Sequence, residues 1–194
     1  MKKFSQIQND AIRRTIKLFS PILEKNISSA DRMKRMHFVE GKIIKKRLKW
    51  YDEHKGELNY TKCEYLTDIQ KAFIILFRHR LKIDTNDLRI VPIYDSKQGI
   101  FTTHIQSRNF CPYLEAFKRM KLKPEESIKL CRLVLEKPCQ ALIDKINPKI
   151  KFSRDYSHIR PLSNYCDERL ILKDYSRSQP NNMQINIRCS LIEK

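Results

Sequence analysis

The spacing of apolar residues changes from a helical to a strand-like period near the middle of the chain, and this change limits the folds open to it. Residues 4–23, 30–50 and 67–81 repeat apolar side chains every three or four positions, as amphipathic helices do. Residues 88–94 and 100–106 instead predict two strands joined by a hairpin loop. The chain therefore begins with helices and continues with a hairpin.

Prolines organise the part that follows the predicted hairpin. Pro112, Pro124 and Pro138 are each expected at the start of a helix, because the first amide of a helix has no partner within it. Residues 149–156 and 165–173 then predict a second pair of strands. The predicted fold is α+β, with a β-β-α-α-β-β unit forming an antiparallel sheet covered on one face by helices and preceded by a helical extension.

Three segments describe the domain organisation that the sequence predicts. Residues 1–60 form a basic N-terminal helical segment, and residues 61–178 form an α/β, cysteine-containing ligand-binding domain. Residues 179–194 are predicted as a C-terminal edge strand, because apolar and polar side chains alternate strictly from Met183 to Leu191. A chain of 194 residues is long enough to bury a core of its own.

No apolar run approaches the roughly 20 residues that a helix needs to cross a bilayer. The N-terminus also lacks the apolar region of a secretion signal. We therefore expect a cytoplasmic protein without a transmembrane segment, whose partners include a small molecule and, as open alternatives, nucleic acid or a second copy of the chain.

The positive charge is concentrated near the N-terminus. The formal net charge is +18, and the first 50 residues hold 14 Lys and Arg against 4 Asp and Glu. Such a segment is attracted to phosphates or to an anionic membrane surface, although a solvated helical face has the same composition. The candidate nucleic-acid-binding residues are Lys42, Lys45, Lys46, Arg47 and Lys49.

Four of the six cysteines lie at predicted element boundaries. Cys111 and Cys139 are expected at helix starts, where free amides and the helix dipole favour the thiolate. Cys131 and Cys166 are their candidate partners. Together the four could be ligands of zinc or an iron–sulfur cluster, yet the chain lacks the C-x-x-C spacing typical of zinc sites. Buried structural thiols are the alternative.

Two histidines and two arginines complete the candidate site. His104 and His158 could orient or deprotonate a cysteine, and Arg154 and Arg160 could bind a carboxylate or phosphate of a ligand. A structural role for the histidines and plain surface charge for the arginines remain open.

Short motifs between residues 105 and 175 carry a family resemblance. They are residues 109–116 (NFCPYLEA), Cys131, residues 146–152 (INPKIKF) and residues 165–167 (YCD). This region resembles the C-terminal half of L-2-amino-thiazoline-4-carboxylate hydrolase-like proteins. It is more distantly similar to the vinyl-reductase-type ligand-binding domain, whose fold is shared with subunits of a vesicle-trafficking complex.

The resemblance implies a pocket for a small molecule or metal, framed by the Cys-Pro helix and the Tyr-Cys-Asp strand. It implies catalytic or ligand roles for Cys111 and Cys166, whereas Cys139 replaces an acidic residue of the family. The leading hypothesis is a cysteine-centred domain that binds a small ligand or metal, or a small-molecule hydrolase. The alternatives are a nucleic-acid-binding or ligand-sensing regulator and a scaffold without ligand.

Overall fold

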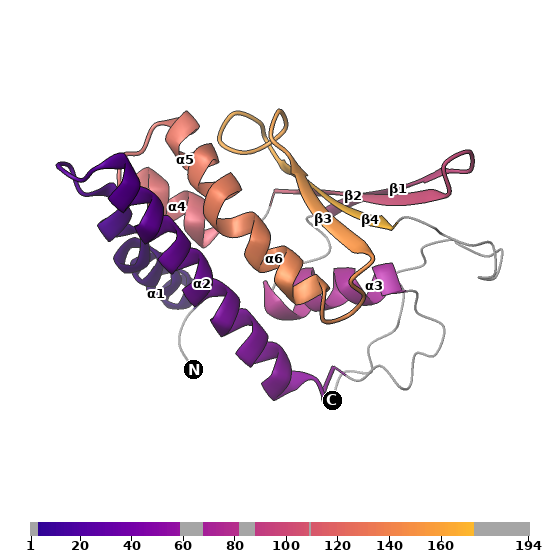
Figure 1. The fold of residues 1–194 in the computed structure, drawn as a ribbon. Coiled ribbons are helices and arrows are strands. Elements are labelled where there is room, and N and C mark those ends of the chain that lie inside the picture. The colour runs from indigo at the N-terminus through magenta and orange to yellow at the C-terminus, as the bar shows by residue number, and fades with distance from the viewer. Residues whose placement is uncertain (1–3, 59–67, 82–87, 109, 173–194) are drawn as a thin grey trace.

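The computed structural model describes residues 4–58, 68–81, 88–108 and 110–172 (Figure 1). The helices are α1 (Phe4–Phe19), the 3-10 turn η1 (Ser20–Leu23), α2 (Ser29–His54), α3 (Asp68–Phe73), the π-helical η2 (Ile74–Arg80), α4 (Pro112–Arg119), α5 (Pro124–Leu130), the π-helical η4 (Cys131–Leu135) and α6 (Glu136–Ile143). The strands are β1 (Leu88–Asp95), β2 (Ile100–Ser107), β3 (Ile150–Asp155) and β4 (Cys166–Leu172). The predicted strand at 179–194 lies outside the described residues.

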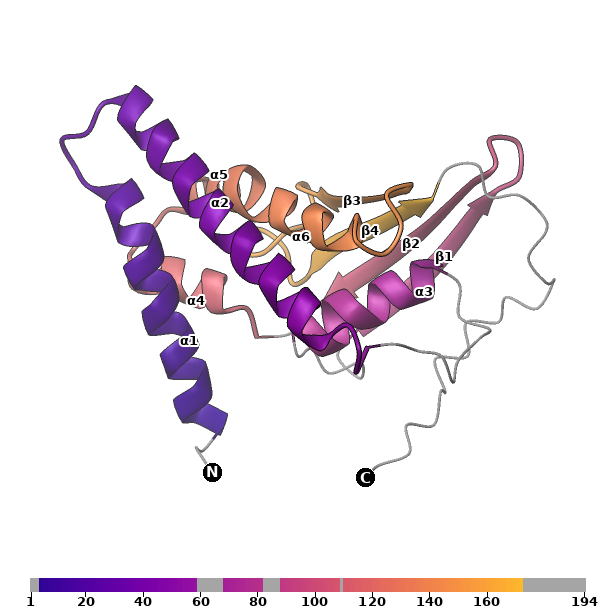
Figure 2. The same ribbon diagram turned by 60° about the horizontal axis from the view of Figure 1, so that its bottom comes forward.

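The four strands form one antiparallel sheet in the order β1-β2-β4-β3, which confirms the predicted α+β class. The central register pairs Ile105 of β2 with Ile90 of β1 and with Glu168 of β4. Figures 1 and 2 show α3 and α6 on the same face of this sheet. The opposite face carries no helix among the described residues, so the sheet has one core face and one outer face.

The two N-terminal helices follow the sequence closely. α1 ends at Phe19, four residues before the end of the predicted helical segment 4–23, and a 3-10 turn that contains Pro21 follows. The Ser28 side chain caps α2 by accepting a hydrogen bond of 3.0 Å from the amide of Asp31. The helix then continues to His54, four residues beyond the predicted end.

The predicted helix start at Pro138 is wrong. α5, η4 and α6 follow one another without a break, and Pro138 is the third residue of α6. A proline inside a helix lacks one amide donor and crowds the carbonyl four residues before it. Here the π-helical turn of η4 comes just before α6, where a widened turn relieves that conflict. Cys139 therefore lies inside a helix, away from any free helix start.

Two buried clusters form the core. One packs α3, η2 and α6 against the sheet and includes Phe77, Leu142 and Ile105, which are all fully buried. The other joins α1, α2, α4 and η4, with the Phe19 and Phe117 rings 5.1 Å apart in an edge-to-face contact. The N-terminal helices thus share a core with the second half of the chain. The predicted boundary near residue 60 lies outside the described residues.

None of the described helices combines the length and the apolar character that crossing a membrane requires.

Candidate functional site

Three strands carry polar side chains at one end of their core face. On β3, Phe152 is followed two positions later by Arg154, and on β4 the apolar Leu170 is preceded by Glu168 and Cys166. On β2 the same face ends in Ser107, which pairs with Cys166. Because side chains alternate between the faces of a strand, these polar ends form one patch beside the apolar core.

This patch is one wall of a cavity of about 210 Å³. The helices supply the other walls, with Arg47 from α2, Arg80 from η2, and three cysteines from the start of α4, from η4 and from α6. The structure therefore brings together six residues that the sequence analysis selected, namely Cys111, Cys131, Cys139, Arg154, Arg160 and Cys166.

The charges around the cavity do not balance. Four arginines line it, whereas Glu168 is the sole carboxylate among its lining residues in the described part of the chain. Arg154 donates from Nε to Glu168 Oε1 over 2.8 Å, and both side chains are 9% exposed. The Nη1 atom of Arg154 and the Nε atom of Arg80 are buried and meet no hydrogen-bond partner among the described residues. Buried donors of this kind normally have an acceptor.

Arg47 corrects the predicted nucleic-acid surface. Its side chain is 2% exposed and donates from Nη1 to Cys139 Sγ over 2.9 Å, so it cannot contact an external polyanion. Burial acts to lower the pKa of Arg47, but the nearby Cys139 sulfur and Tyr113 hydroxyl raise it overall. Lys42, Lys45, Lys46 and Lys49 are exposed as expected.

Cys111 lies where the sequence predicts, as the N-cap residue of α4. The expected shift toward thiolate is wrong, however, because burial raises the pKa of Cys111 and outweighs the hydrogen bonds from the Leu114 and Tyr113 amides. Burial also raises the pKa of Cys131, to about 12, despite the nearby Arg154. At neutral pH both residues are protonated thiols.

The other two cavity cysteines contact guanidinium groups. Cys139 Sγ lies 2.9 Å from Arg47 Nη1 and 3.5 Å from Arg154 Nη2. Cys166 Sγ lies 3.5 Å from Arg160 Nε, and Arg160 also donates from Nη1 to the carbonyl of Arg108 over 3.1 Å. The arginines therefore hold both cysteine and backbone atoms in place around the cavity.

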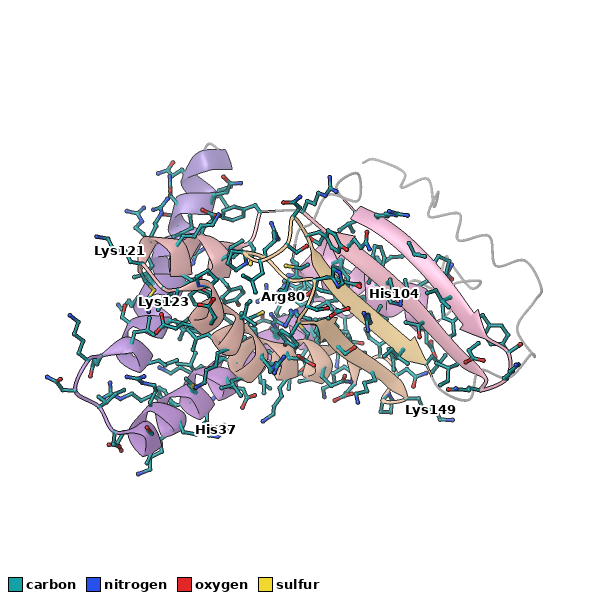
Figure 3. All side chains as sticks on the ribbon, turned by 90° about the horizontal axis from the view of Figure 1, so that it is seen from above. His37, Arg80, His104, Lys121, Lys123 and Lys149 are labelled. Atoms are coloured by element: carbon teal, nitrogen blue, oxygen red, sulfur yellow. The ribbon has the colours of Figure 1, made fainter. Side chains whose placement is uncertain are left out.

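The two predicted histidines lie away from the cavity. His104 is on the outer face of the sheet, as Figure 3 shows, with Nδ1 3.4 Å from Asp167 Oδ2. His158 lies in the loop after β3, where Nδ1 is 3.3 Å from Asp155 Oδ2 and the ring stacks on Tyr165. Neither histidine lines the cavity, so neither is placed to orient or deprotonate a cavity cysteine.

Within the described residues, no three His, Cys, Asp or Glu side chains are grouped closely enough to hold a metal ion. The predicted zinc or iron–sulfur site therefore gains no support from this geometry.

Arg47, Arg80 and Glu168 line the cavity although none was predicted to do so. The sequence pattern indicates a core-facing position for two of them. Arg47 lies at helical spacing from the apolar Met36 and Ile43, and Glu168 lies on the same face of its strand as Leu170. A charge at a core position indicates a buried ionic site. Arg80 has no such signal, because it ends a helix and its approach to the cavity depends on the tertiary fold (Figure 3).

Comparisons with the models of known protein families, with curated proteins and with solved structures find no match to this chain.

Proposed function

We propose that this domain binds a small organic anion in the cavity between the sheet and helices α2, α4 and α6. The observation that carries the proposal is the charge of the lining, with four arginines against one carboxylate. Cations that outnumber the carboxylates around a largely buried site are costly, and an anionic ligand would supply balancing negative charge. It would also accept hydrogen bonds from the buried, unpartnered Arg80 Nε and Arg154 Nη1.

The lining also favours a chemical class of ligand. Guanidinium groups match the planar oxygens of carboxylates and phosphates, which they bind through paired hydrogen bonds. Leu81, Phe110 and Leu135 add apolar surface to the same cavity. At about 210 Å³ the cavity is smaller than the roughly 300 Å³ at which sites for drug-sized ligands begin. A small carboxylic acid or phosphate ester with a short apolar part fits these properties.

The cysteines support binding better than nucleophilic catalysis. A thiolate is the reactive form of cysteine, and the raised pKa values of Cys111 and Cys131 keep both protonated at neutral pH. Hydrolysis with Cys111 as nucleophile and Cys166 as partner, which the resemblance implies, would first require the thiol to ionise. We therefore propose ligand binding and assign no covalent step.

Calorimetric titration of the purified chain with inorganic phosphate and a panel of small carboxylic acids tests the proposal. Arg80→Gln removes a cavity cation without breaking the Arg154–Glu168 pair, so it should weaken binding by at least tenfold. Arg32→Gln removes the same charge from the exposed surface of α2 and is the matched control. Saturable binding that Arg80→Gln lowers and Arg32→Gln leaves unchanged is expected. Absence of binding, or equal losses in both variants, would refute the proposal.

A further inference from the structure

A second concave feature lies between α1 and α2, on the basic helices and apart from the anion cavity. This groove of about 440 Å³ has apolar residues in its lining, including Leu18, Pro21 and Val39. Its cationic lining residues are Arg14 and Lys17 from α1 and Arg35 and Lys42 from α2. Arg35 is already paired with Glu24 at 2.5 Å, so the other three carry the charge available to a ligand. No acidic residue lines it in the described part of the chain. The groove thus combines apolar lining residues with positive charge from both helices. Figure 2 shows α1 and α2 joined by one short connection.

An aromatic ring is exposed in this groove. Phe38 is 62% exposed, the largest exposure among the bulky apolar residues described, and Lys42 Nζ lies 4.3 Å from its ring centroid. A ring exposed beside cations offers a planar face for stacking and partners for negative charge.

The positive charge continues along α2 from the groove. The exposed lysines at positions 42, 45, 46 and 49 have helical spacing that places them on one side of α2. From Phe38 to Lys49 the helix extends about 16 Å at the usual rise of 1.5 Å per residue. Lys49 has an exposed ion pair with Glu53 at 3.6 Å, which is weak enough to exchange for a phosphate.

We propose that this groove and the adjoining lysines bind single-stranded nucleic acid, with one base stacked on Phe38 and the backbone phosphates bound by the surrounding cations. Proteins that bind single strands without sequence preference combine a positively charged groove with aromatic rings. The concave shape favours a single strand over a duplex, whose major groove receives a protruding helix. Charge complementarity selects a polyanion, and a ring exposed beside cations in a concave site suits a stacked base whose phosphates lie next to it. Binding to a duplex or to an anionic membrane is an alternative outcome of the test.

Fluorescence anisotropy of the full chain with a labelled 12-nucleotide oligo(dT) tests this assignment at several salt concentrations. Phe38→Ala should weaken binding about tenfold and leave the salt dependence unchanged, because base stacking does not release counterions. Lys42→Gln should weaken binding and reduce the slope of log K against log salt by about 0.7. The matched controls are Leu162→Ala, which removes another exposed apolar side chain, and Lys151→Gln, on β3; neither should change binding.

Several outcomes would overturn the assignment. They are an absence of binding at low salt, an unchanged affinity in Phe38→Ala, and tighter binding to a 12-base-pair duplex or to vesicles of 30% phosphatidylserine in phosphatidylcholine than to oligo(dT). Phe38 is largely exposed, so its replacement should leave the fold intact, which circular dichroism verifies. Arg80→Gln should not alter oligo(dT) binding, since Arg80 lines the other cavity.

Discussion

Replacing Glu168 by Gln should destabilise the protein severely, because Glu168 is the one carboxylate among the described lining residues of a cavity with four arginines. The Arg154–Glu168 pair is 2.8 Å long and both side chains are 9% exposed, so water screens it little. Removing one partner of such a buried pair costs about 3–5 kcal/mol. For a chain of this length that corresponds to a fall in Tm of about 10 °C.

The charge imbalance also predicts an order among variants. Arg154→Gln leaves Glu168 near the three remaining arginines, so it should cost less than Glu168→Gln. The double variant Arg154→Gln/Glu168→Gln keeps a hydrogen-bonding pair without buried charge, so it should be more stable than Glu168→Gln alone. Phosphate at 100 times its Kd should return about 2.7 kcal/mol to any variant that still binds it.

Urea unfolding followed by circular dichroism, with and without phosphate, measures these differences in the free energy of unfolding. Equal stability of Glu168→Gln and the unchanged protein would refute a desolvated ion pair. A larger loss in Arg154→Gln than in Glu168→Gln would refute the excess of positive charge in the cavity.

Three further outcomes follow from the described contacts. Iodoacetamide at pH 8 should label Cys111 and Cys131 much more slowly in the folded protein than in urea, because burial raises the pKa of both thiols. Peptide mass identifies the labelled cysteine, and rapid labelling of Cys111 in the folded protein would contradict this. Hydrogen bonds from Ser157, with help from His158 and Arg169, lower the pKa of Asp155 in the folded protein below its unfolded value near 3.9. The stability that this shift provides is therefore present above about pH 4 and is lost as the pH falls through the lower pKa of the folded state. Asp155→Asn should therefore lose less stability than the unchanged protein between pH 5 and pH 2 in urea titrations, and parallel losses would count against it. Ser28→Ala should lower the free energy of unfolding by about 1 kcal/mol through loss of the α2 cap, whereas Ser28→Thr should retain most of it in the same assay.

The sequence predicts the fold well because its elements depend on local patterns. The strands at residues 88–94 and 100–106 are each one residue longer in the structure, and the helix starts at Pro112 and Pro124 are confirmed. The predicted helix start at Pro138 is wrong because a proline is an ambiguous local signal. A proline can open a helix or follow a π-helical turn within one, and the packing of η4 against α2 is a tertiary feature that the local sequence does not contain.

The sequence predicts which residues form the candidate site better than it predicts their chemistry. The cysteines and arginines selected by position do meet in one cavity, but the pKa of Cys111 depends on burial, which a position at a helix start does not reveal. His104 could have been assigned to the outer face, because Thr102, His104 and Gln106 alternate along the strand with the apolar Phe101 and Ile105. Arg80 reaches the cavity only through the tertiary fold.

The arginine side-chain Nε–H signals in ¹H–¹⁵N spectra test the central claim most directly, because the Nε–H of Arg80 is one of the buried donors that a bound anion would occupy. On titration with phosphate, the signal absent from Arg80→Gln should shift and saturate, while the signal assigned through Arg32→Gln should not. Small, linear shifts confined to exposed arginines, with Arg80 unchanged up to high phosphate, would show that the cavity does not bind anions.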